Sequence, residues 1–347
     1  MTGVTADLAV VVGGANIDIK GKPSGSFIPR TSNPGTITRT VGGAGRNVAH
    51  NLALLGIPTR LITAVGDDAL GERVRTETAA AGVDLSDTLI VPGAATGTYL
   101  AVLDEKGEMV AAISDMQVLE ELTAFYLSAR ETAIRRARLA VVDANLGEEA
   151  LAYVVATARA ASVPVVALPV SVEKAARLVP YLAGVDYLIS NRNELVALVR
   201  GPSHVAGMAD DVSDGVEDEA AALLAQGPRA VLVTLGQDGV YLMARPAGAT
   251  PVAARLPAYP GPIVDVTGAG DAFAAGVVYG LYHGSDIFTA ARYGLAAAAI
   301  TVAAPAAVSP QMSPAAIGRM IEGKPSVEGE PLSEGESCIQ HGDEGES

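Results

Sequence analysis

Short apolar runs recur along this chain, and an Ala-rich stretch with helical periodicity separates each run from the next. A short apolar run that ends at Gly or at a polar residue is typical of a strand buried on both faces. Strands that alternate with helices build βαβ units, so the pattern predicts an α/β fold with a central, mostly parallel sheet flanked by helices. We expect strands at residues 8–13, 60–65, 139–143, 163–168, 187–190 and 230–234, and helices at 45–55, 70–81, 148–161 and 217–226.

Two segments depart from this pattern because their apolar residues alternate with polar ones. They cover residues 36–41 and 98–114, and the second is typical of a hairpin with a Gly-containing turn. Together with a strand around 17–20, they could extend one edge of the main sheet or form a small sheet of their own. We favour the second interpretation, a β lid built from about 16–40 and 96–116.

Composition narrows the classes of partner. The domain at 7–322 precedes a tail, 323–347, that is rich in Gly, Glu and Ser and is expected to be acidic and disordered. The formal net charge of −15 disfavours a nucleic-acid partner, since phosphate binding needs a basic face. The longest apolar run, 295–308, is broken by Pro305 and is shorter than the roughly 20 residues that cross a bilayer. With no signal-peptide pattern and the single cysteine Cys338, we expect a cytoplasmic protein without disulfides.

The most specific motif is Gly268-Ala269-Gly270-Asp271, which precedes a helical stretch of small residues. Backbone N–H groups at a helix start, together with the helix dipole, form a site for an anion such as a phosphoryl group. Asp271 lies in the first turn, where it could accept a proton from an attacking hydroxyl. The alternative is that Asp271 only caps the helix and stabilises its dipole.

Two other polar clusters are suited to a hydroxylated ligand. In the run 42–47, glycines allow a close approach of the backbone, and Asn47 can both donate and accept hydrogen bonds. Asn16 and Asp18 project from the same face of a strand. A simple Gly-Gly turn is the alternative for the first cluster, and a solvated turn is the alternative for the second.

The glycines after the first strand do not have dinucleotide-fingerprint spacing, which disfavours an NAD-dependent dehydrogenase.

Two further motifs follow the strands at 187–190 and 230–234. Asn191 and Glu194 are three residues apart at a helix start and could hold a water-bridged Mg²⁺ and triphosphate oxygens. An Asn at the N-cap with Glu at the third helical position is equally the spacing of a capping box. The loop from Thr234 to Gly239 contains two glycines beside the same predicted sheet edge.

In this order and at about this spacing, the motifs at 42–47, 191–194 and 265–271 identify the chain as similar to the PfkB family of carbohydrate and nucleoside kinases. These kinases are ribokinase-like, and the resemblance covers about residues 7–320. The combination is much more specific than any single motif. Within the family, the chain looks most like members that act on pseudouridine, on the stretches 16–18, 32–35, 42–47, 51–56 and 113–116.

The resemblance implies an ATP- and Mg²⁺-dependent kinase that phosphorylates the 5′-hydroxyl of pseudouridine, with K⁺ as a further cation. It implies that Asp271 is the general base, beside an anion hole formed by Gly268, Ala269 and Gly270. The substrate-binding residues it implies are Asn16, Asp18, Ser32, Asn33, Gly43, Asn47, Ile113 and Asp115. The ATP-binding residues are Asn191, Thr234, Gly236, Gly239 and Thr267, while Glu194 holds Mg²⁺ through water and Asp265 holds a monovalent cation. Because such lids often pair, it also implies a homodimer through the lid, with a small nucleoside or sugar as the substrate and no nucleic-acid or membrane partner.

One position departs from the pattern of the pseudouridine-directed members. There an acidic residue precedes the Pro of the strand at 165–171, whereas Leu168 precedes Pro169 here, and Lys174 nearby is retained. Two other hypotheses stay open. Another nucleoside or ribose-type sugar kinase would share the catalytic end and differ in the lid, and a non-catalytic ligand-binding relative would have no need of a base at Asp271.

Overall fold

The main sheet of the protein is mostly parallel, as the apolar runs predict. A computed structural model describes residues 7–205, 215–246, 248–322 and 330–331. Six neighbouring strands of this sheet, β4, β1, β9, β10, β11 and β12, are parallel to one another. The three strands that follow at the β12 edge, β13, β14 and β15, each pair antiparallel with their neighbour. In that order the strands are β4 (Thr59–Ile62), β1 (Ala9–Val12), β9 (Leu139–Asp143), β10 (Val165–Leu168), β11 (Tyr187–Asn191), β12 (Ala230–Thr234), β13 (Val240–Ala244), β14 (Val252–Leu256) and β15 (Glu330–Pro331).

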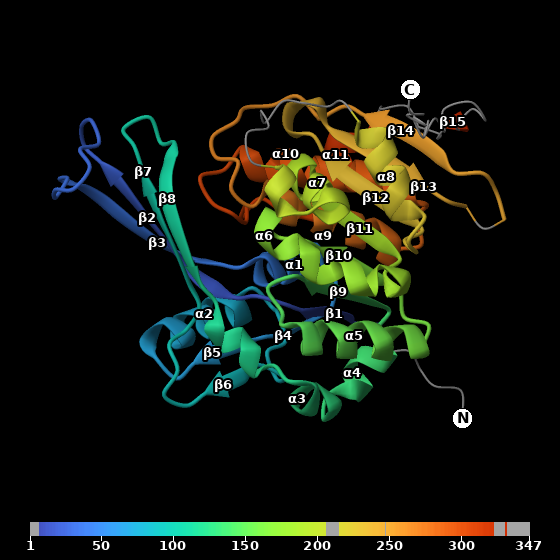
Figure 1. The fold of residues 1–347 in the computed structure, drawn as a ribbon, viewed down its shortest axis with the longest axis horizontal. Coiled ribbons are helices and arrows are strands. Elements are labelled where there is room, and N and C mark those ends of the chain that lie inside the picture. Colours follow the sequence, from blue (N-terminus) through green and yellow to red (C-terminus); the bar gives the residue numbers. More distant parts are fainter. Residues whose placement is uncertain (1–6, 206–214, 247, 323–329, 332–347) are drawn as a thin grey trace, which may run out of the picture.

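Helices cover both faces of the parallel strands, which explains why these strands are apolar throughout (Figure 1). Val10 and Val12 of β1 pack in the cluster formed with α5, α7 and α8. Ala9 and Val11 point the other way and pack in the cluster formed with α1, α9 and α10. The helices are α1 (Ala44–Leu54), α2 (Ala69–Ala80), α3 (Ala124–Ser128), α4 (Glu131–Arg136), α5 (Glu148–Ala160), α6 (Val172–Ala175), α7 (Arg192–Arg200), α8 (Val216–Leu224), α9 (Ala269–Tyr282), α10 (Ile287–Val302) and α11 (Pro314–Ile321).

The small residues of α9 allow it to lie close against α10. A Cβ atom at Gly276 would stand 2.5 Å from the carbonyl oxygen of Tyr293, and one at Gly280 would stand 2.7 Å from the Cα atom of Ala290. Any larger side chain at these positions would push the two helices apart, and so shift the N-terminal end of α9. The short 3₁₀ helices of the described chain are η1 (Gln117–Glu121), η2 (Ala176–Gly184), η3 (Pro202–His204) and η4 (Gly236–Asp238).

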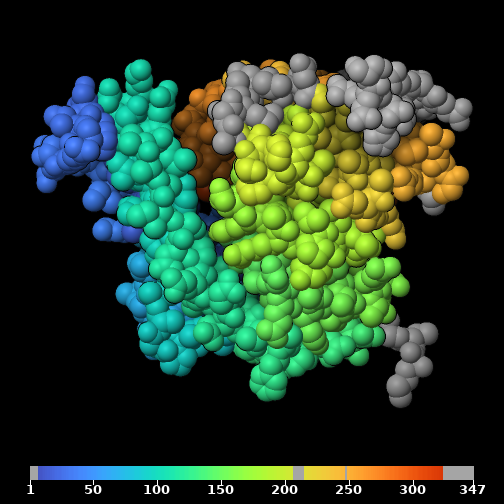
Figure 2. Space-filling model, viewed as in Figure 1, coloured from blue at the N-terminus to red at the C-terminus, as the bar shows by residue number. Residues whose placement is uncertain are grey.

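The alternating segments form a four-stranded sheet that is separate from the main sheet, so they do not extend its edge. The strand order is β3 (Gly35–Gly42), β2 (Asn16–Pro23), β7 (Thr98–Leu103) and β8 (Met109–Asp115), with β2 and β7 parallel and the outer pairs antiparallel. This sheet projects beside the main body, with a hollow between the two (Figures 1 and 2). Ile37, Met109 and Ile113 on it are each more than 60% exposed.

A small parallel pair, β5 (Ala64–Gly66) and β6 (Leu89–Val91), completes the sheets of the described residues. The expected tail at 323–347 lies outside the described residues except for Glu330–Pro331, which pair with β14. No helix in the described ranges is both long enough and apolar enough to cross a bilayer.

Candidate active site

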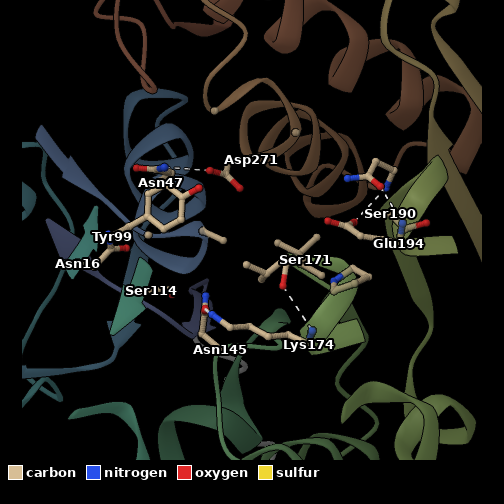
Figure 3. Close-up of a pocket in the computed structure, with 18 of the residues that line it drawn as sticks. Asn16, Asn47, Tyr99, Ser114, Asn145, Ser171, Lys174, Ser190, Glu194 and Asp271 are labelled. Atoms are coloured by element: carbon tan, nitrogen blue, oxygen red, sulfur yellow. Dashed lines mark hydrogen bonds between the residues drawn. The ribbon is translucent and has the colours of Figure 1, made fainter. Parts of the chain in front are cut away.

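A cavity of about 540 Å³ lies between the four-stranded sheet and the C-terminal ends of the parallel strands. Ligands of open α/β sheets bind at this edge, outside the carboxyl ends of the strands. Figure 3 shows the lining side chains directed into one shared space. The predicted site residues that line it are Asn16, Asp18, Gly43, Asn47, Asn191, Glu194, Thr234, Thr267, Gly268, Gly270 and Asp271.

Asp271 and Asn47 meet in this cavity although they are 224 residues apart in the chain. The side-chain Nδ2 of Asn47 donates to Oδ2 of Asp271 at 2.9 Å (Figure 3). Burial is the largest cause that raises the pKa of Asp271 to about 7, and the charges of Asp143, Asp18 and Glu194 act in the same direction. The hydrogen bond from Asn47 lowers the pKa but does not reverse the shift. A carboxylate with a pKa near neutrality is well matched to proton transfer from a hydroxyl.

The start of α9 presents backbone N–H groups beside Asp271. Gly268 is the N-cap, with a φ of 79° that a residue with a side chain rarely adopts. The N–H of Ala269 already donates to the carbonyl oxygen of Val266 at 3.2 Å. Within the described part of the chain, the N–H groups of Gly268, Gly270 and Asp271 have no acceptor. These three are therefore the N–H groups left for an anion, and Ala269 is not among them.

Asn16 and Asp18 lie side by side at the start of β2, as the alternation predicts. Nδ2 of Asn16 donates to Oδ1 of Asp18 at 2.7 Å. Burial raises the pKa of Asp18, although Asn16, Lys20 and Arg46 all act to lower it. The carboxylate of Asp18 occupies the space that a Cβ atom of Gly42 would need. Gly42 thus serves the packing of a carboxylate of the protein itself, not the approach of a ligand.

A buried carboxylate that sequence reasoning did not identify, Asp143 at the end of β9, ties three segments together beneath the cavity. Its Oδ2 accepts from the N–H of Gly14 at 2.8 Å and of Gly45 at 2.7 Å, and its Oδ1 accepts from the N–H of Asn145 at 2.9 Å. Burial raises the pKa of Asp143 against the effect of these hydrogen bonds. The carboxylate therefore joins the end of β1 and the start of α1 to β9, which fixes the helix that carries Asn47.

Lys174 of α6, which binds Asn145, lies along the wall of the cavity (Figure 3). Its Nζ donates to Oδ1 of Asn145 at 2.6 Å, and burial lowers the pKa of the ammonium group. Leu168, which replaces the expected acidic residue, is 6% exposed and belongs to the apolar cluster on the α1 side of the sheet. Two residues on, Val170 has a φ of 69°, and the N–H of Ser171 donates back to Pro169 at 2.8 Å. This is a strained turn on the cavity wall.

At the far end of the cavity, Asn191 and Glu194 form the capping box of α7, so that interpretation is confirmed. Oδ1 of Asn191 accepts from the N–H of Glu194 at 2.8 Å, and Oε2 of Glu194 accepts from the N–H of Asn191 at 3.0 Å. Burial raises the pKa of Glu194 to about 7. Both residues also line the cavity, as does Ser190, whose hydroxyl is buried and has no partner in the described chain. Capping and ligand binding are thus compatible here.

One contact joins the four-stranded sheet to the segment that precedes α9. Nζ of Lys20, on β2, donates to Oγ1 of Thr267 at 2.8 Å and lies 3.9 Å from Oδ2 of Asp265. Oδ1 of Asp265 accepts from the N–H of Thr267 at 2.8 Å. Burial alone would raise the pKa of Asp265, but the hydrogen bonds from Thr267 and the charge of Lys20 lower it overall. Asp265 itself does not line the cavity.

The remaining predicted residues lie outside the cavity lining. Asn33 holds its own loop, with side-chain hydrogen bonds of 2.8 Å to the N–H and carbonyl groups of Ile28. The other positions, on the exposed loop before β3, on β8 and around η4, are Ser32, Ile113, Asp115, Gly236 and Gly239. Sequence reasoning did not select Tyr99, Ser114, Met116 or Asn145, which do line the cavity. Ser114 and Met116 belong to the stretch 113–116 that carries the family resemblance, whereas no motif marks Tyr99 or Asn145. The pairing of β7 with β8 brings Tyr99 and Ser114 to the edge of the cavity.

Comparison with known proteins gives a consistent result. The model of the pfkB family of carbohydrate kinases matches residues 6–314. Pseudouridine kinase of Escherichia coli (strain K12) is 35% identical over 319 residues, which cover 91% of this chain and 97% of that protein. Guanosine-inosine kinase of Exiguobacterium acetylicum is 28% identical over 297 residues, 84% of this chain and 93% of that protein.

Solved structures agree on the fold. A carbohydrate kinase from Agrobacterium tumefaciens is 33% identical, with a TM-score of 0.75 over 90% of this chain and 96% of that one. A ribokinase from Arabidopsis thaliana, complexed with ribose and ATP, is 24% identical, with a TM-score of 0.77 over 90% and 98% of the two chains. A ribokinase-type structure from Escherichia coli, in complex with ATP and Mg²⁺, is 20% identical, with a TM-score of 0.75 over 90% and 98%.

Proposed function

The chain belongs to the pfkB family of carbohydrate kinases, and on that premise we propose that it phosphorylates the 5′-hydroxyl of pseudouridine. The family and the ribokinase-like fold make it an ATP-dependent phosphotransferase that acts on a hydroxyl group. The choice of pseudouridine rests on the 35% identity to the Escherichia coli pseudouridine kinase across 91% of the chain. Kinases for other substrates also match, among them the guanosine-inosine kinase.

The observation that carries the proposed chemistry is the meeting of a carboxylate of raised pKa with unpaired backbone N–H groups in one cavity. Asp271 supplies the carboxylate, and Gly268, Gly270 and Asp271 supply the N–H groups. In phosphoryl transfer the protein mainly positions the reactants and stabilises charge, so a base and an anion hole are sufficient equipment. A protein that only bound a nucleoside would have no use for this pair.

In the proposed reaction, Asp271 accepts the proton of the substrate hydroxyl as its oxygen forms a bond to the γ-phosphorus of ATP. The bond from that phosphorus to the β–γ bridging oxygen breaks, and ADP leaves. The N–H groups at the start of α9 stabilise the charge on the transferred phosphoryl group. Asn47 holds Asp271 at 2.9 Å and, with Asn16 and Asp18, binds the ribose hydroxyls. A closed cavity keeps water from taking the place of the substrate hydroxyl.

The opposite end of the cavity fits ATP with Mg²⁺. Mg²⁺ in such sites keeps several waters and uses one or two carboxylates plus the substrate phosphates, and it neutralises phosphate charge. Glu194 supplies a carboxylate there, and Asn191, Ser190 and Thr234 line the same part of the cavity. We assign Asn191, Thr234 and Thr267 to the ATP side, with Gly236 and Gly239 on the loop beyond the lining residues.

We also propose Asp265 as a ligand of a monovalent cation such as K⁺. The ammonium of Lys20, 3.9 Å away, is a resident positive charge on the same carboxylate. If the cation binds there, initial rates in K⁺ will exceed those in tetramethylammonium at equal ionic strength, and the substitution Asp265→Asn will remove the difference. Equal rates in the two salts would exclude this role.

The four-stranded sheet is proposed to act as the lid and as the interface of a homodimer. Ile37 on β3 and Met109, Val110 and Ile113 on β8 expose large apolar side chains, which a second copy of the same sheet would cover. Ser32, Asn33 and Asp115 would reach the substrate only when the lid closes. Sedimentation equilibrium of the wild type and of Ile113→Asp tests the dimer, which the variant should weaken.

The substrate is tested by ADP release with Mg-ATP and a panel of pseudouridine, uridine, cytidine, guanosine, adenosine and ribose, with Asp271→Asn as the control. Selective turnover of pseudouridine that is lost in the variant supports the proposal. Turnover of ribose or of another nucleoside would keep the mechanism and replace the substrate. Ligand binding without any turnover would favour the non-catalytic alternative and direct attention to Leu168.

A further inference from the structure

One charged side chain behind the cavity has no part in the chemistry described so far. Arg46 is 4% exposed, on the first turn of α1, and it is not among the residues that line the cavity. Its Nε donates to Oγ1 of Thr78 at 3.1 Å, and its Nη1 donates to the carbonyl oxygen of Val41 at 3.3 Å and to Oδ1 of Asn47 at 3.2 Å. Burial lowers its pKa to about 10, so it stays charged at neutral pH.

The bond to Asn47 decides how the amide of Asn47 is oriented. A guanidinium group carries only donors, so it can bind the oxygen of an amide but not its NH₂ group. With Oδ1 of Asn47 held by Arg46, the NH₂ group faces the opposite way, where Nδ2 donates to Asp271. A free amide could turn its oxygen toward Asp271, and that arrangement would favour the protonated carboxyl group instead.

We propose that Arg46 is a positioning residue for phosphoryl transfer, which locks the Asn47 amide so that its N–H stabilises the ionised form of the base Asp271. The proposal rests on the proposed role of Asp271. In this arrangement the buried guanidinium of Arg46 fixes the amide of Asn47, and that amide keeps Asp271 ionised and able to act as a base at neutral pH.

The electrostatic surroundings make this lock important. The charges that act most strongly on Asp271 are negative and come from three different elements: Asp18 on β2, Asp143 on β9 and Glu194 on α7. Each of them favours the protonated form, and the N–H of Asn47 is the side-chain group that opposes them. The positive groups nearby are Lys174 on α6, which lines the same cavity, and Lys20 on β2, which binds Thr267. The groups that face Arg46 are Asp18 on β2, Glu77 on α2 and His50 on α1, whose pKa is lowered to about 4 by burial.

The first experiment compares the pH dependence of kcat in the wild type with that in Arg46→Met, Arg46→Lys and Thr78→Val, using any hydroxyl acceptor that is turned over. In Arg46→Met one charge-assisted hydrogen bond is lost. The pKa of Asp271, and with it the acid limb of the kcat profile, should then rise by about one pH unit, so kcat at pH 6 should fall about tenfold. Arg46→Lys keeps a donor for Oδ1 of Asn47, so its acid limb should lie close to that of the wild type. Thr78→Val removes a different partner of Arg46 and leaves the hydrogen bond to Asn47, so it should lower Tm but leave the acid limb of the pH profile unchanged.

A second readout does not need turnover. In protein labelled with ¹³C-aspartate, the carboxyl carbon of Asp271 is assigned by its absence from Asp271→Asn and is followed by NMR through the pH range. Its midpoint should rise in Arg46→Met and in Asn47→Ala, and Arg46→Met should add nothing in the Asn47→Ala background. An unmoved midpoint in Arg46→Met, or a shift that persists without Asn47, would overturn the proposal. If no acceptor is turned over but the midpoints behave as stated, the proposed substrate or activity is wrong, while the effect of Arg46 on the Asn47 amide and on the protonation of Asp271 stands.

Discussion

The two glycines at the start of α9 allow the anion hole to be tested separately from the fold. Gly270 lines the cavity, and a Cβ atom on it would meet no atom of the described chain within 4 Å other than its own helix backbone. A Cβ atom on Gly268 would overlap the carbonyl oxygen of Ala307, at a φ of 79°. Gly270→Ala should therefore spare the fold and obstruct the site, whereas Gly268→Ala should damage the fold.

The expected magnitudes follow from these surroundings. Replacing Gly by Ala inside a helix stabilises a protein by roughly 0.5–1 kcal/mol, so the Tm of Gly270→Ala should stay the same or rise slightly. Its new methyl group would keep a phosphoryl group from the free N–H groups. Loss of one such donor costs about 10²–10³ in rate in other enzymes, and we expect a loss of this order in kcat/KM. Gly268→Ala pays about 1–2 kcal/mol for the left-handed backbone alone, with the overlap in addition.

The assay is coupled ADP release at varied acceptor, with thermal melts of each variant by circular dichroism. Gly318→Ala is the matched control, because its Cβ atom also meets nothing within 4 Å, in a helix (α11) away from the cavity lining. It should gain the same stability as Gly270→Ala and keep full activity. If Gly270→Ala retains kcat/KM within about twofold of the control, the N–H groups of α9 are not the anion hole.

Three further predictions concern charged groups in the cavity and beside it. Asp271→Asn should lower kcat by about 10²–10⁴ while isothermal titration still detects acceptor binding, and unchanged turnover would remove Asp271 from the mechanism. Because the pKa values of Asp271 and Glu194 rise to about 7 from ordinary values of 3.8 and 4.5, the folded state holds protons that the unfolded state releases, so stability falls as the pH rises from about 4 to 7. Thermal melts across this range should show the fall, and Asp271→Asn should flatten part of it. Lys20→Met removes the contacts to Thr267 and Asp265 from a group that is 31% exposed, so it should raise KM for the acceptor and change unfolding free energy by no more than about 1 kcal/mol in urea titrations.

The parallel strands were predictable because burial on both faces leaves a local trace, an unbroken apolar run. Strand β14, Val252–Leu256, leaves no such trace, because its first three residues are only partly buried and the exposed Arg255 interrupts the run before the buried Leu256. The separate four-stranded sheet was predictable, because its apolar residues alternate with polar ones and its strands interrupt the α/β series. Its register was not, since β2 pairs with β7, about 80 residues later, and no local signal specifies that partner.

The site was predictable where a motif is local and not where it depends on approach in space. Asp271 and the glycines before it are neighbours in the chain, so their chemistry could be inferred directly. Asp143 could not be identified, because its partners Gly14 and Gly45 lie 129 and 98 residues away. The run at 42–47 is predicted to contact a ligand, and Gly43 and Asn47 of it do line the cavity. Gly42 instead makes room for Asp18, and Gly45 lies against Asp143.

The distance between the Asn47 and Asp271 side chains depends both on how α1 is anchored to the sheet and on how α1 packs against α9. Asp143 fixes the start of α1 to the sheet, and Arg46 fixes the amide of Asn47, but in the described chain neither side chain has a hydrogen bond to α9. The position of Asp271 relative to Asn47 is set instead by the packing of α1 on α9, where Leu52 and Phe273 lie in one buried apolar cluster. Because buried cores are close-packed, a change of volume in that cluster moves one helix against the other. Substitutions at this interface should therefore change the 2.9 Å contact between the two side chains, and with it the protonation of the base, without altering any residue of the cavity.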